Sequence, residues 1–129
     1  MLKKIDHIGI AVADLHAARR FFQEALGLEP SWESTSERAK VVFFRLGESE
    51  IELVEFLTPD RRDATLRGEP LGRLDHVAIE VDDLAGATSR LRAEGVRHGD
   101  EVRSTRGVSV QSEPETTSGV ALQFVERAR

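Results

Sequence analysis

Residues 5–15 read IDHIGIAVADL, and residues 74–84 repeat the pattern as LDHVAIEVDDL. The two stretches align at a constant offset of 69 residues, the difference between His76 and His7, and six of the eleven aligned positions are identical. In both copies an Asp-His pair opens an apolar run that reads as a strand. A repeat of this size predicts two similar modules, each of which leaves one face uncovered and buries it against the other.

The same order of elements follows each copy of the repeat. Asp14 and Asp83 occupy the N-cap position of a helix, and Gly27 and Gly95 stand where a helix ends in a left-handed residue. Strand-like runs follow at 28–33, 40–46 and 50–57, and again at 97–103, 107–112 and 120–126. The sequence therefore predicts an α+β fold of two βαβββ modules. Helical spacing marks the apolar positions of the two helices, which are Leu15, Ala18, Phe22, Ala25 and Leu26 in the first and Leu84, Ala87 and Leu91 in the second.

We expect residues 1–129 to form a single domain, with modules at 1–58 and 74–129. The stretch 59–73 between them is polar, contains two prolines and two glycines, and has no sustained hydrophobic period. It is predicted to be a linker, part of which is able to form a turn of helix.

Composition narrows the chemistry and the partners. The chain has no cysteine, which excludes disulfides, thiolate ligands and cysteine nucleophiles. Its formal charge is −5, with one tryptophan and no tyrosine, whereas a nucleic-acid-binding protein more often has a basic surface with exposed aromatic residues. No apolar run approaches the roughly 20 residues that cross a bilayer, and we expect no signal peptide. The expectation is a cytoplasmic protein that binds neither nucleic acid nor membranes.

The two repeated histidines are candidate metal ligands. Side chains alternate along a strand, so His7 and His76 point the same way relative to their own modules. If the modules pair by a pseudo-twofold axis, the two imidazoles meet in one cleft, and neutral imidazole nitrogens suit Co, Zn, Ni, Mn or Fe. A single histidine in an apolar strand is more often structural, but its repetition favours the metal-ligand interpretation.

Further ligands are expected on the last strand of each module. Glu52 lies in the run EIELVEF (50–56), on the face of Glu50, and the matching position of VALQFVE (120–126) is Gln123. A carboxylate in mid-strand is costly to bury without a partner, although an exposed edge strand would also explain Glu52. Gln123 offers a carbonyl oxygen but carries no transferable proton.

Taken together, DHIGIAV, RLGESEIELVEF, LDHVAIEVDDL and SGVALQFVE resemble the vicinal oxygen chelate superfamily of glyoxalases, bleomycin-resistance proteins and extradiol dioxygenases, and most closely its methylmalonyl-CoA epimerase family. The resemblance implies paired βαβββ modules that form a curved open sheet around a divalent metal ion. It also implies His7, Glu52, His76 and Gln123 as the metal ligands, a homodimer, and a small-molecule substrate such as an acyl-CoA. The implied activity is transfer of a proton at C2 of a methylmalonyl-CoA-like thioester, with Glu52 and Gln123 as candidate catalytic residues.

The chain departs from this family at the positions of its acids. Glutamate is usual where Gln123 stands, and a second acid used in part of the family falls on Val42. Glu50 and Glu80 are the other acids on the expected ligand faces, although a structural or solvent-facing role is the commoner explanation for each. A glyoxalase-type lyase and a resistance-type protein that binds a small molecule without turnover therefore remain alternatives on the same fold.

Overall fold

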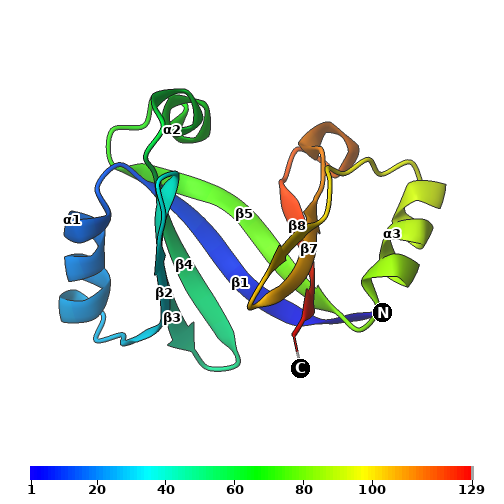
Figure 1. Cartoon of the computed structure of the whole chain (residues 1–129), viewed down its shortest axis with the longest axis horizontal. Coiled ribbons are helices and arrows are strands. Elements are labelled where there is room, and N and C mark those ends of the chain that lie inside the picture. Colours follow the sequence, from blue (N-terminus) through cyan, green and yellow to red (C-terminus); the bar gives the residue numbers. More distant parts are fainter. Residues whose placement is uncertain (129) are drawn as a thin grey trace. The chain divides into compact units, whose positions relative to one another are not determined.

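The structure is a computed structural model that describes residues 1–128. The chain divides into two compact units, which we call the His7 unit (His7–Asp75) and the His76 unit (Met1–Asp6 with His76–Arg129). Each unit consists of a four-stranded arrangement and its helices, and both are drawn in Figure 1.

The His7 unit contains the first βαβββ series from His7 onward, and residues 2–6 of the first strand belong to the His76 unit. Its strands have the order β2-β3-β4-β1, in which β1 runs parallel to β4 and the other neighbours are antiparallel. An additional helix, α2, follows β4 within the stretch 59–73. The elements are β1 (Leu2–Val12), α1 (Leu15–Arg20), the π-helical turn η1 (Phe21–Ala25), β2 (Pro30–Thr35), β3 (Ala39–Leu46), β4 (Ser49–Phe56) and α2 (Pro59–Leu66).

The His76 unit repeats the series with the order β5-β8-β7-β6, and β5 runs parallel to β8 as β1 does to β4. The α+β class and the βαβββ order of both modules are confirmed. Strand β6 (Val102–Ser104) is shorter than the expected 97–103. An isolated bridge upstream of it joins His98 to Ser112. The elements are β5 (Gly72–Val81), α3 (Leu84–Ala93), β6 (Val102–Ser104), β7 (Gly107–Gln111), the 3₁₀ turn η2 (Pro114–Thr116) and β8 (Leu122–Arg127).

Strand alternation divides each set of strands into a helix-covered face and a second face. In the His7 unit, Ile51 and Leu53 of β4 pack with α1, whereas Glu50 and Glu52 project from the opposite face. In the His76 unit, α3 covers the corresponding apolar face of β5, β7 and β8. The expected faces of residues 50–56 are therefore confirmed. The two helix-side cores are formed by Val12, Leu15, Val42, Phe44 and Leu53 and by Val81, Leu84, Ala87, Val110 and Phe124.

Helix α1 does not keep its α-helical period to the end. From Phe21 the hydrogen bonds run from residue i to i+5, as in the bond from the Leu26 amide to the Phe21 carbonyl (3.2 Å). The wider turn rotates the following residues, so Ala25 and Leu26 are exposed rather than buried as expected. Phe22 still packs on the core, where its ring stacks on Phe44.

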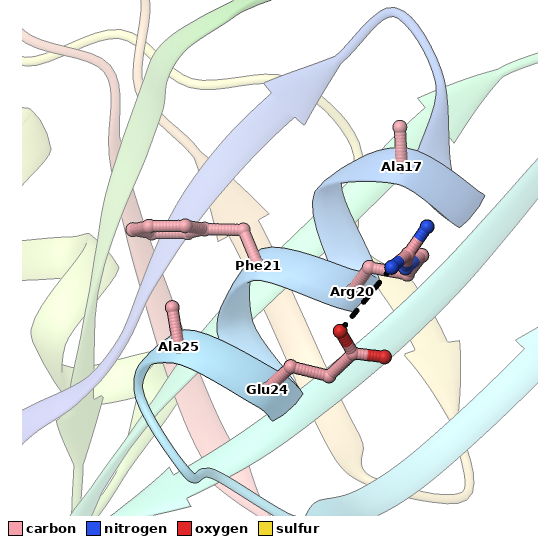
Figure 2. A pocket seen from close by; sticks show the side chains of 5 residues that line it. All are labelled: Ala17, Arg20, Phe21, Glu24 and Ala25. Atoms are coloured by element: carbon pink, nitrogen blue, oxygen red, sulfur yellow. Dashed lines mark hydrogen bonds and ion pairs between the residues drawn. The ribbon is translucent and has the colours of Figure 1, made fainter.

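The exposed side of α1 and η1 carries the shallow hollow shown in Figure 2. It is lined by Phe21, which is 55% exposed, by two alanines, and by an Arg20–Glu24 pair at 3.4 Å. On another side of the helix, Arg19 donates a hydrogen bond to Glu33 of β2, and this bond lowers the pKa of the Glu33 carboxyl. None of the predicted ligands lines the hollow.

The two modules also share a helix cap that the sequence did not indicate. The Leu15 amide donates to Glu55 Oε1 (2.8 Å), and the Leu84 amide donates to Glu126 Oε1 (2.9 Å). Each first helix is thus capped by a glutamate from the last strand of its own module, where a carboxylate also complements the helix dipole.

The expected N-caps differ between the modules. Asp14 accepts from the Ala17 amide (3.2 Å), as predicted. Asp83 has the extended backbone of an N-cap but makes no capping hydrogen bond through its side chain in the described chain. Its carboxylate lies over Gly86, where an added Cβ would come within 2.7 Å of Oδ2.

The core of the His7 unit provides a direct stability test. Leu53 is fully buried, so we expect Leu53→Ala to lower the free energy of unfolding by about 2–5 kcal/mol through lost burial and the cavity left behind. Urea denaturation followed by circular dichroism measures this change. Leu46→Ala is the matched control, because Leu46 is 55% exposed and its loss should cost no more than about 0.5 kcal/mol. Equal losses in both variants would contradict the assignment of this core.

Among the helices formed by residues 1–128, none has the length and apolar character required to span a bilayer.

Candidate functional site

In the His7 unit, the structure brings His7 and Glu52 together. Gly9 of β1 is the register partner of Glu52 on β4, and His7 is the partner of Glu50, so all these residues share the face opposite α1. His7 Nε2 lies 3.4 Å from Glu52 Oε1, and the two side chains are only 6% and 14% exposed. An imidazole and a carboxylate are thus held side by side on a largely buried surface.

Aromatic side chains surround His7 on this face. The Phe43 ring meets the imidazole edge-on with 5.1 Å between ring centroids, and Trp32 meets Phe43 in the same way at 5.7 Å. Phe43 is the register partner of Glu52, and Trp32 is the partner of Phe43, so the three residues form one row across β4, β3 and β2. The pair His7–Glu52 therefore lies beside an apolar wall that restricts the imidazole.

A second acid, Glu50, is buried next to this pair. It is 5% exposed, and Ser31 Oγ donates a hydrogen bond to its Oε2 at 2.5 Å. Of the structural and solvent-facing roles expected for Glu50, the solvent-facing one is wrong, because the side chain is buried beside its register partner His7.

In the His76 unit, His76 and Gln123 project from the same face. Ala78 of β5 is the register partner of Gln123 on β8, and His76 is two residues before Ala78, so the side chains of all three point to one side. His76 is 8% exposed. Gln123 Nε2 donates to Ser109 Oγ at 3.3 Å, whereas the buried Oε1 has no hydrogen-bond partner among residues 1–128.

Glu80 completes this face. It is 5% exposed and forms an ion pair with Lys3, whose Nζ lies 3.3 Å from Oε2. As at position 50, a solvent-facing role is excluded, and the charge of the buried carboxylate is balanced by a partly exposed lysine.

The comparison with known families agrees with this arrangement. Residues 6–110 match the model of the glyoxalase/bleomycin resistance protein/dioxygenase superfamily, which is most of the chain. The chain belongs to this superfamily. The resemblance inferred from the two Asp-His strands is confirmed.

The similar proteins within the superfamily include methylmalonyl-CoA epimerases. The ethylmalonyl-CoA/methylmalonyl-CoA epimerase of Cereibacter sphaeroides is 32% identical over 100 residues, which cover 75% of each chain. A structure of a methylmalonyl-CoA epimerase in complex with methylmalonyl-CoA and NH4+ is 27% identical, with a TM-score of 0.89 over 99% of this chain and 96% of that one. A variant of the Streptomyces coelicolor methylmalonyl-CoA epimerase in complex with 2-nitronate-propionyl-CoA has the same identity and TM-score over the whole of both chains.

One residue assignment drawn from the superfamily needs correction. Val42 was expected at the position of a second acid, but it is fully buried in the helix-side core with Phe44 and Leu53. Strand alternation instead puts Val41 on the face of Glu52, through its register partner Val54. Since both residues are valines, β3 of this superfamily member presents no carboxylate from either position.

The sequence did not identify several side chains that lie near the proposed ligands. Trp32 and Phe43, which line His7, read only as apolar strand residues, and Ser31 and Ser109 read as turn or strand polar residues. Pairing the expected strands in register would have found Phe43, because it faces Glu52 across a tight hairpin. The hydrogen bonds made by the two serines have no comparable signal in the sequence.

Proposed function

We propose that the protein is a metal-dependent epimerase that transfers a proton at C2 of a methylmalonyl-CoA-like thioester. Membership in the superfamily and the similarity to methylmalonyl-CoA epimerases, including structures with methylmalonyl-CoA or 2-nitronate-propionyl-CoA bound, support this activity. The structural observation that carries the proposal is that, in both modules, a buried histidine of the first strand shares a face with an acid or amide of the last strand.

One divalent ion is proposed to be bound by His7, Glu52, His76 and Gln123. The residues fit this role by their chemistry, because two imidazoles, a carboxylate and an amide oxygen form a mixed N/O set that suits first-row metals. The buried Gln123 Oε1 supports it further: burying an amide oxygen without a hydrogen bond is costly, and a cation would satisfy it. The ion is Co, Zn, Ni, Mn or Fe.

When bound, the ion would supply positive charge that stabilises the enolate-like transition state as the C2 proton leaves. The chain's own residues provide the surroundings. The Phe43 ring packs against His7 and Trp32 packs against Phe43, and such apolar neighbours strengthen electrostatic interactions within the face. Glu52 Oε1 lies 3.4 Å from His7 Nε2, so the carboxylate and the imidazole lie next to each other on this face.

Epimerisation requires one group that removes the C2 proton and another that returns a proton to the opposite side. Gln123 does neither, because an amide has no transferable proton at neutral pH. Among the described residues, Glu50 and Glu80 are buried acids on the ligand faces of their own units. We therefore propose these two carboxylates, rather than Gln123, as the groups that exchange protons.

Solvent isotope exchange tests the activity. We expect deuterium from D2O to enter C2 of methylmalonyl-CoA in the presence of the protein and Co²⁺, and not in the presence of either alone. Mass spectrometry of the acyl group measures the exchange. His16→Ala is a suitable control for loss of any histidine, because His16 lies exposed on α1 and should leave the exchange unchanged.

Absence of exchange with methylmalonyl-CoA and with ethylmalonyl-CoA would contradict an epimerase. Binding of either thioester without exchange would instead favour the second candidate, a small-molecule binding protein. One observation supports that candidate: β3 and β8 carry valine and glutamine where the epimerase family has acids.

The homodimer and the cytoplasmic location expected from the sequence are part of the same proposal. Light scattering coupled to size-exclusion chromatography should give about twice the mass of the 129-residue chain, 14.3 kDa. A monomer at micromolar concentration would contradict the dimer without affecting the assignment of the ligands.

A further inference from the structure

The repeated Asp-His pair contains a residue that the proposed metal site does not use. Both aspartates, Asp6 and Asp75, are identical between the copies of the repeat, and each directly precedes a proposed ligand. The boundary between the two units falls inside both Asp-His pairs. Asp6 belongs to the His76 unit and His7 to the His7 unit. Asp75 belongs to the His7 unit and His76 to the His76 unit. Each aspartate is therefore the last residue of one unit before a ligand of the other.

Asp6 is firmly held in the His76 unit. It is 4% exposed, and Arg127 Nη1 of β8 lies 3.0 Å and 3.2 Å from its two carboxylate oxygens. A hydrogen bond between two charged groups is stronger than a neutral one, and a buried carboxylate is stable only with such partners. Two further contacts, from Lys3 to Glu80 and from the Asp82 amide to the Met1 carbonyl, hold the preceding residues in the same unit.

The second aspartate is in a different setting, because its neighbouring arginine, Arg73, lies two residues before it on the same strand, β5. Arg73 Nη1 lies 3.9 Å from Asp75 Oδ1, and the Asp75 side chain is 19% exposed. Arg73 also donates to the Thr65 carbonyl of α2 at 3.1 Å, which fixes its guanidinium in the His7 unit. Asp6 accepts hydrogen bonds from an arginine of a different strand and is also the more deeply buried of the two aspartates.

We infer that Asp6 is a positioning residue for His7, and that Arg127 acts through it. Consecutive Cα atoms are about 3.8 Å apart and consecutive side chains of a strand point to opposite sides, so fixing Asp6 fixes the origin and direction of the His7 side chain. The imidazole is then presented to Glu52 and against the Phe43 ring without having to be ordered by a ligand. The Arg127 guanidinium holds Asp6 through contacts of Nη1 with both carboxylate oxygens.

A ring contact in the metal-free protein tests this inference independently of the proposed function. The nuclear Overhauser effect between the His7 and Phe43 rings, whose centroids are 5.1 Å apart, should be strong in the unmodified protein and weakened or lost in Asp6→Asn. Glu113→Gln is the matched control, because it makes the same acid-to-amide change at an exposed ion pair of the same unit, Glu113–Arg97. The control should keep the contact at full strength.

Arg127→Lys serves as the conservative variant, since it keeps the positive charge but loses the planar guanidinium, and it should give an intermediate contact. If Asp6→Asn does not fold, Arg127→Lys alone tests whether Asp6 positions His7. An undiminished His7–Phe43 contact in folded Asp6→Asn, or in Arg127→Lys where only that variant folds, would overturn the inference.

A second measurement connects the inference to the metal, and here it rests on the proposed function. Co²⁺ should bind Asp6→Asn about tenfold more weakly than the unmodified protein, the size of effect seen when residues that orient a ligand are replaced. Co²⁺ affinity equal to that of the unmodified protein in folded Asp6→Asn would overturn the positioning role. If the unmodified protein binds no Co²⁺ at all, the metal proposal fails, while the ring contact still decides the role of Asp6.

Discussion

Replacing His7 by alanine is expected to reduce the affinity for Co²⁺ by more than about 100-fold. Loss of residues that merely orient a ligand costs 10–100-fold, and here a ligand itself is removed. The imidazole is also buried, with the Phe43 ring edge-on against it. Isothermal titration calorimetry with Co²⁺ measures the change, and proton exchange at C2 of methylmalonyl-CoA should fall in parallel.

The control for this prediction comes from the same chain, which has four histidines. His16→Ala removes an exposed imidazole on α1 and should leave Co²⁺ affinity unchanged. Equal affinity of His7→Ala and His16→Ala would remove His7 from the ligand set. Melting temperatures of both variants establish that any loss arises from the ligand and not from unfolding.

Replacing Gln123 by glutamate is expected to increase the rate of C2 proton exchange by about 100-fold. A general acid or base positioned at the reacting group typically contributes 10²–10⁴-fold, and a carboxylate at this position restores a group that accepts and donates protons. Ser109 Oγ, 3.3 Å from Gln123 Nε2, is able to donate to the new carboxylate. The added negative charge should also raise the affinity for a divalent cation.

Gln111→Glu is the matched control for this gain. Gln111 of β7 is the register partner of Gln123, and its side chain is exposed. Its replacement by glutamate is therefore the same amide-to-acid change on the same face. It should leave the exchange rate unaltered. A rate in Gln123→Glu no higher than in Gln111→Glu would contradict the expected gain and would leave proton transfer to Glu50 and Glu80.

Much of the fold follows from the sequence because the repeat gives the same information twice. The apolar and polar positions of residues 50–56 fall on the predicted faces, since a period of two leaves no other solution once one face is buried. The left-handed glycines that end the first helices, Gly27 (φ 72°) and Gly95 (φ 91°), are as expected. The juxtaposition of His7 and Glu52 within one unit also follows from the strand faces, given that β1 lies next to β4.

Other features depend on tertiary contacts that leave little trace in a pattern. The π-helical turn at Phe21–Ala25 is one example, because the apolar spacing of residues 15–26 fits an α-helix equally well. Helix α2 is another: its mostly polar residues resemble a linker, and it is stabilised by burying Leu66 against Ala11 and Val54. The error at Val42 came from aligning a strand one residue out of step, which reverses every side chain.

The glutamate caps fix the position of each proposed ligand along its strand relative to the start of a helix. Glu52 and Glu55 lie on opposite faces of β4, three residues apart, as do Gln123 and Glu126 of β8. Sliding either strand by two residues would keep every side chain on its face but carry the cap about 7 Å away from its amide.

The two copies differ in length elsewhere. The offset between them grows from 69 residues at His7 and His76 to 71 at Glu52 and Gln123, and stays 71 at Glu55 and Glu126. The second module is therefore two residues longer between its first and last strands, while the interval between ligand and cap is identical in both. The constant interval fixes the position of the ligand relative to the helix cap, so the loops can differ in length without shifting the ligand.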